Sequence, residues 1–130
     1  MRAVDEIVLT LPRERGFGAV AGLVLGGVAA RHDLTIDVLE DLQLALETLL
    51  ERDEDETAIR IVLRIDDALI EASVGPFEGA TVVELEHEAD GTLGLRRLLD
   101  TVMDRVVVER RPDGCWVELH KGYAAAAGGG

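Results

Sequence analysis

The sequence predicts an α+β fold, a two-layer α/β sandwich in which helices cover one face of a mixed, mostly antiparallel sheet. The spacing of the apolar residues along the chain predicts elements in the order strand, helix, helix, strand, strand, helix, strand, strand. A length of 130 residues with 48% hydrophobic residues suffices for one domain with a single core, which we place at residues 1–123. Because aromatic residues make up only 3% of the chain, that core must be aliphatic.

The first two predicted elements are a strand over Asp5–Leu11, closed by Pro12, and a helix over Glu14–Arg31. From Phe17 to Ala30 this helix contains four glycines, each of which costs about 0.5–1 kcal/mol relative to alanine in a helix interior, so they suggest close packing against another backbone or a helix that needs tertiary support. Three of them recur at every fourth residue and share a face, which predicts close packing against another backbone of the same chain: Gly18, Gly22 and Gly26.

A second amphipathic helix is predicted over Ile36–Glu51, with either Asp33 or Thr35 as its N-cap. Alternation of apolar and polar residues over Ala58–Ile65 predicts a half-buried strand. Ala68–Ser73 returns as its hairpin partner, and the segment Gly75–Gly79 is expected to break the strand pattern.

The stretch Ala80–Gly91 is acidic, and its pattern favours neither helix nor strand. After Gly94, apolar residues at helical spacing predict a third helix, and a turn at residues 111–114 joins two strands, Arg105–Arg110 and Cys115–Lys121. Residues 124–130 form a low-complexity tail that we expect to be disordered.

Composition narrows the class of function. A net charge of −13 and a pI near 4.5 disfavour nucleic acids and anionic membranes and favour a basic protein partner. The single cysteine, Cys115, excludes an internal disulfide framework and a zinc site built on paired cysteines. No signal peptide or spanning segment is evident, so we expect a cytoplasmic protein. His32, His87 and His120 are dispersed along the sequence and predict no metal site.

Two segments carry a resemblance to a known family. The stretch from Gly94 to Glu109 and the hairpin segment from Pro112 to Leu119 resemble the GHKL (histidine-kinase-like ATPase) fold, and within it the RsbW-like anti-sigma factors, which are small serine/threonine kinases. The resemblance extends from Ile7 to about Lys121. It implies a sigma factor or an anti-anti-sigma protein as partner, and a homodimer is compatible with it.

The resemblance also implies a nucleotide site. The helix Ile36–Glu51 corresponds to the helix that carries a general base and, four residues on, an asparagine that binds Mg²⁺. Here the base is present as Glu47, but the metal-binding position is Glu51, which adds a negative charge facing the triphosphate.

The other nucleotide motifs are altered as well. In the adenine-binding motif Gly75 is present, but Ser73 replaces the aspartate that would accept from the adenine amino group. The glycines that would cradle phosphates match only partly, at Gly91 and at Gly94 with Leu95. We therefore expect the binding of ATP and Mg²⁺ to be weak or lost.

These observations lead to an anti-sigma-like regulatory protein that binds a sigma factor or an antagonist, and they leave enzymatic activity open. The alternative is an active Mg·ATP-dependent serine kinase that phosphorylates an anti-anti-sigma antagonist, with Glu47 as general base and Glu51 as metal ligand. A third interpretation is a small α+β protein unrelated to this family. It would be favoured if no four- or five-stranded sheet lay under the helix Ile36–Glu51.

Overall fold

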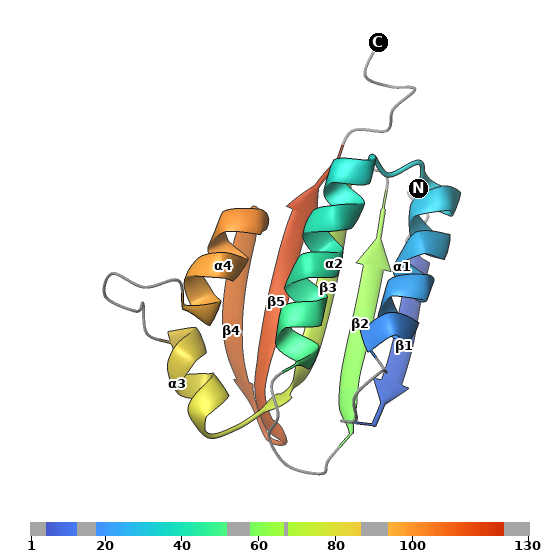
Figure 1. Ribbon diagram of the computed structural model, residues 1–130. Helices are drawn as coiled ribbons and strands as arrows, with labels where there is room; N and C mark the ends of the chain where they lie inside the picture. Colours follow the sequence, from blue (N-terminus) through green and yellow to red (C-terminus); the bar gives the residue numbers. More distant parts are fainter. Residues whose placement is uncertain (1–4, 13–17, 52–57, 67, 87–93, 124–130) are drawn as a thin grey trace.

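The computed structural model describes residues 5–12, 18–51, 58–66, 68–86 and 94–123, and these form two layers (Figure 1). One layer is a five-stranded antiparallel sheet, and the other consists of four helices on one face of that sheet. The predicted α+β class is confirmed. In chain order the elements are β1 (Asp5–Leu11), α1 (Gly18–His32), α2 (Ile36–Leu50), β2 (Ile59–Ile65), β3 (Leu69–Phe77), α3 (Ala80–Glu86), α4 (Leu95–Val102), β4 (Arg105–Arg111) and β5 (Gly114–Gly122).

The strand order is β1-β2-β3-β5-β4, and each neighbouring pair of described strands is antiparallel. β3 is the central strand, between β2 and β5. Its register places Val74 opposite Ile61 on one side and opposite Val117 on the other. Because successive side chains of a strand point to opposite faces, this register fixes which residues of the three central strands share a face.

One face of the sheet is covered by the helices, and we call the other the open face because no described helix lies on it (Figure 1). On β2 the buried residues alternate with exposed or half-buried ones, as predicted. The open face of the three central strands carries Arg60, Val62 and Arg64 of β2, Glu71, Ser73 and Gly75 of β3, and Trp116, Glu118 and His120 of β5.

Helix α2 lies over the middle of the sheet and supplies much of the core (Figure 1). Of the two predicted caps, Thr35 is the one used: its hydroxyl accepts from the N–H of Val38 at 3.3 Å. The buried residues of α2 recur at intervals of three and four and meet the aliphatic residues of β2, β3 and β5: Val38, Leu42, Ala45, Leu46 and Leu49.

The segment that follows Ser73 differs from its expectation. β3 does not end at Ser73 but continues through Gly75 and Pro76 to Phe77, with a cis Gly75–Pro76 bond and a shift of register against β5. The shifted register lets Phe77 enter the core while the strand stays paired with Cys115. The ambiguous acidic stretch contains the short helix α3, over Ala80–Glu86.

The glycines of α1 are not packed against another backbone, so that expectation was wrong. A Cβ atom added at Gly18, Gly26 or Gly27 would meet no atom within 4 Å, and at Gly22 it would meet only the side chain of Gln43 at 3.9 Å. Contacts among the described residues therefore do not require these glycines.

We expect Gly26→Ala and Gly27→Ala each to stabilise the fold by about 0.5–1 kcal/mol, because alanine lowers the conformational entropy of the unfolded chain and finds open space in the helix. Urea unfolding, monitored by circular dichroism at 222 nm, measures the change.

Gly75→Ala is the contrasting variant, since its Cβ would lie 2.7 Å from a ring carbon of Trp116. Overpacking of this kind costs about 1–3 kcal/mol. If Gly27→Ala were as destabilising as Gly75→Ala, α1 would have to be packed more tightly than the structure shows.

Candidate functional site

The two acidic residues assigned to catalysis and metal binding lie on the solvent side of α2. Glu47 is exposed, and its side chain has no partner among the described residues. Glu51 is the exposed C-cap, whose backbone N–H donates to the carbonyl of Glu47 at 3.0 Å. Both carboxylates are accessible, but no buried polar group is directed toward them within the described part of the chain.

Ser73 and Gly75 lie on the open face, the side of the sheet opposite α2. The ring of Trp116 covers Gly75, and this ring is fixed by a 2.9 Å hydrogen bond from its Nε1 to Asp113 Oδ1 and by the guanidinium of Arg111 at 4.5 Å from its centroid. Gly75 is thus explained by the close approach of an indole ring. The sheet separates Ser73 and Gly75 from Glu47 and Glu51, so the structure does not bring the four residues together.

Gly94 and Leu95 form the start of α4, and Gly91 lies outside the described residues. Gly94 is the N-cap without a capping side chain, and its carbonyl accepts from the N–H of Leu98 at 3.0 Å. The side chain of Leu95 is buried in the core. Neither Gly94 nor Leu95 therefore presents a polar side chain at this helix start.

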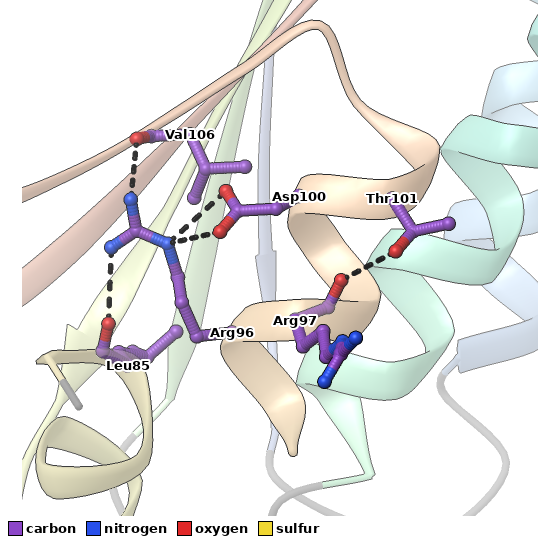
Figure 2. A network of polar contacts seen from close by, with 6 residues as sticks. All are labelled: Leu85, Arg96, Arg97, Asp100, Thr101 and Val106. Atoms are coloured by element: carbon purple, nitrogen blue, oxygen red, sulfur yellow. Dashed lines mark hydrogen bonds and ion pairs between the residues drawn. The ribbon is translucent and has the colours of Figure 1, made fainter. Parts of the chain in front are cut away.

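Arg96 holds that helix start in place (Figure 2). Its guanidinium donates to the carbonyl oxygens of Leu85 in α3 and Val106 in β4, both at 3.1 Å. Its Nε lies 3.2 Å from both carboxylate oxygens of Asp100, one turn further along α4. One side chain thus joins α3, α4 and β4, and its donors are used within the fold.

A shallow pocket of about 420 Å³ lies where β3, β5 and α3 meet the end of β4, and none of the predicted site residues lines it. Arg110 and Arg111 face it, but Arg110 is paired with Glu86 at 2.6 Å and Arg111 with Glu109 at 3.2 Å. These pairs neutralise the charges that would attract an anion. The remaining lining residues are Phe77, Glu78, Gly79, Val82, Gly114 and Cys115.

A cluster that the sequence did not predict lies on the open face. Glu71 and His120 are direct cross-strand partners, and Glu118 is two residues from His120 on the same strand. One potential ligand atom from each residue lies within 4.8 Å of the others. The dispersed histidines predicted no metal site, and that prediction did not consider strand pairing: the pairing of β3 with β5 places His120 beside two carboxylates that are distant from or adjacent to it in the chain, Glu71 and Glu118.

The environment of Glu118 is unfavourable for a second negative charge. Burial between the strands raises the pKa of this carboxyl, and the charges of Glu109 and Glu71 and a hydrogen bond shared with Glu71 act in the same direction. His120 opposes them. At neutral pH an ionised Glu118 therefore weakens the fold.

We expect Glu118→Gln to raise the thermal midpoint at pH 7.5 in a buffer with chelator. The folded state holds the Glu118 proton more tightly than the unfolded chain, so its stabilisation is present below the unfolded pKa and is lost as the pH rises through the folded pKa. Glutamine cannot ionise, so the advantage of the variant should shrink as the pH falls toward 4.

The control for this experiment is Glu47→Gln, which removes an exposed carboxyl without a partner among the described residues. An equal gain from both variants, or a gain that does not depend on pH, would show that only net charge matters.

The outer face of α1 is the second notable surface. From Gly18 to Ala30 the helix carries no charged side chain, although 30% of the chain is charged. Leu23 is 78% exposed, and Val20 and Gly27 lie on the same face at helical spacing. An uncharged helix face that exposes a large apolar side chain to this extent is a candidate interaction surface.

Comparison of the chain with protein-family models and with curated proteins finds no match. Among the described helices, none is both long enough and apolar enough to cross a membrane.

Proposed function

We propose that this chain is a regulatory, anti-sigma-factor-like protein on a GHKL-type fold that binds a sigma factor or an antagonist protein and has lost most of its affinity for nucleotide. The observation that carries the proposal is the uncharged outer face of α1, with Leu23 at its centre. The function is binding, and the partner is a protein.

The glycines of α1 support a protein partner. They lower the intrinsic stability of the helix, and within the described residues no contact requires them. A helix face without Cβ atoms lets a second backbone approach closely, and the stability lost in the free protein is recovered when a partner covers the face. Gly26 and Gly27 would then serve the complex rather than the free chain.

Charge supports a basic partner. The chain carries 26 acidic residues against 13 basic ones, so its surface attracts a positively charged protein over a distance of about 8–10 Å at physiological salt. The apolar face of α1 would supply the contact area, and the net negative charge of the chain would speed the encounter.

The architecture is compatible with the family that the sequence resembles. That resemblance requires a four- or five-stranded sheet under the helix 36–51, and a five-stranded sheet lies there. The order of elements also agrees with the expected one, with α3 as an additional short helix.

The division of the nucleotide motifs between two sides of the sheet supports loss of ATP binding. Glu47 and Glu51 lie on the helix layer, whereas Ser73 and Gly75 lie on the open face beneath Trp116. A single nucleotide cannot contact both sets while the sheet remains intact.

We expect no thermal shift with millimolar Mg·ATP or Mg·ADP, whereas a ligand at 100 times its Kd would stabilise the fold by about 2.7 kcal/mol. We also expect no gain from the double variant Ser73→Asp with Glu51→Asn, because the two positions lie on opposite sides of the sheet. Differential scanning fluorimetry with a metal-free control measures both. A metal-dependent shift in the parent chain would restore the kinase alternative.

For the partner surface, we expect Leu23→Lys to weaken binding to the cognate sigma factor or antagonist at least about tenfold, because a lysine placed in an apolar contact must be desolvated. The measurement is a titration of purified candidate sigma factors and antagonists from the same genome by biolayer interferometry.

Val83→Lys, at an exposed apolar position of α3, is the matched control and should leave affinity unchanged. Binding that both variants retain would exclude α1 as the contact surface. Absence of binding to every candidate would refute the proposed function.

A further inference from the structure

We propose that Glu71, Glu118 and His120 form a binding site for a divalent first-row transition-metal ion such as Zn²⁺ on the open face of the sheet. The site joins the two strands at the centre of the fold, β3 and β5. It lies on the other side of the sheet from α1 and is independent of the proposed partner surface.

The geometry of the cluster fits a small ion. Its three ligand atoms lie within 4.8 Å of one another, and Nδ1 of His120 is 3.9 Å from Oε2 of Glu71. Ligands at zinc distances of about 2.0–2.2 Å in a tetrahedral arrangement lie about 3.4 Å apart. On the proposal, rotation of the two flexible glutamate side chains closes the difference, because their χ angles are free to change while the strands stay paired.

Ser73 provides an independent indication that a group is bound here. Ser73 is only 8% exposed, and its hydroxyl has no hydrogen-bond partner among the described residues. Its cross-strand partner is Glu118, and it follows Glu71 by two residues, so its side chain lies on the same face as the cluster. Buried hydroxyls almost always have a partner, and a water bound to the metal ion would supply one.

The ligand atoms of the three residues favour one class of ion. Two carboxylates and one imidazole suit Zn²⁺ and its first-row neighbours, whereas Mg²⁺ and Ca²⁺ prefer oxygen ligands alone. Three protein ligands leave the fourth tetrahedral position for water, adjacent to Ser73.

The surrounding charges leave the cluster available to a cation. Arg64, which is directly opposite Glu71 on β2, is engaged with Glu6 at 3.5 Å. Arg105 is opposite His120 on the edge strand β4 and is exposed. Glu109 contributes a further negative charge near Glu118. A divalent ion would relieve the repulsion among these carboxylates.

The test is calorimetric titration of the chelator-treated full chain with ZnCl₂ at pH 7.5, with MgCl₂ and CaCl₂ in parallel. We expect saturable one-to-one binding of Zn²⁺ at micromolar or tighter affinity and no saturable binding of the other two ions. Glu71→Gln and His120→Gln should each weaken zinc binding at least about tenfold, since each removes a ligand. In long-range ¹H–¹⁵N spectra the ring of His120 should shift.

Two matched controls test for nonspecific surface binding. His32→Gln removes a histidine that is bound to Asp5 at the far edge of the sheet, and Glu47→Gln removes an exposed carboxylate of α2 on the other side of the sheet. Both should keep the parent affinity within about threefold. Absence of saturable zinc binding, or equal affinity in the parent and both ligand variants, overturns the proposal. Far-ultraviolet spectra in chelator establish that each variant is folded.

Discussion

The packing of α2 on the aliphatic face of β2, β3 and β5 is the constraint on which the rest of the structure depends. With so few aromatic residues, the core must be filled by branched aliphatic side chains from two layers, and α2 supplies Leu42, Leu46 and Leu49 to its centre. Lys121 of β5 adds a polar link, since its ammonium reaches Asp41 of α2 at 3.0 Å and the carbonyl of Val102 in α4 at 2.8 Å. Helices on either side of α2 are placed relative to this contact.

Burial of one sheet face leaves the other face to polar residues, and this division determines where chemistry is available. Alternate residues of β3 lie in different environments: Ala72 and Val74 are buried in the core, and Glu71 and Ser73 lie on the open face. Ser73 and the helix that carries Glu47, which the family resemblance assigns to one nucleotide site, are therefore separated by the thickness of the sheet. The same alternation gathers Glu71, Glu118 and His120 on one surface.

Most of the fold could be predicted from the sequence, because the periods of α2 and β2 are regular and Thr35 is a strong cap. β3 could not, because continuation through Gly75 and Pro76 depends on a register shift against β5 that local sequence does not encode. The surroundings of the α1 glycines also depend on tertiary structure, as does the cluster at His120, whose members are brought together only by the pairing of distant strands. Sequence patterns predicted the local elements. The grouping of residues at each site depends on the register between paired strands, which those patterns do not determine.

Two features of the chain reduce its stability without an evident structural benefit, and they lie on opposite sides of the sheet. Glycines interrupt α1 where alanine would fit, and Glu118 places a carboxyl beside Glu71 where glutamine would repel less. Local sequence choices that conflict with the fold are expected at functional surfaces, since selection there acts on binding rather than on stability. The proposed protein partner on α1 would explain the first feature, and the proposed cation between β3 and β5 would explain the second. The two proposals concern different residues on opposite sides of the sheet, and together they describe a binding module with two separate surfaces.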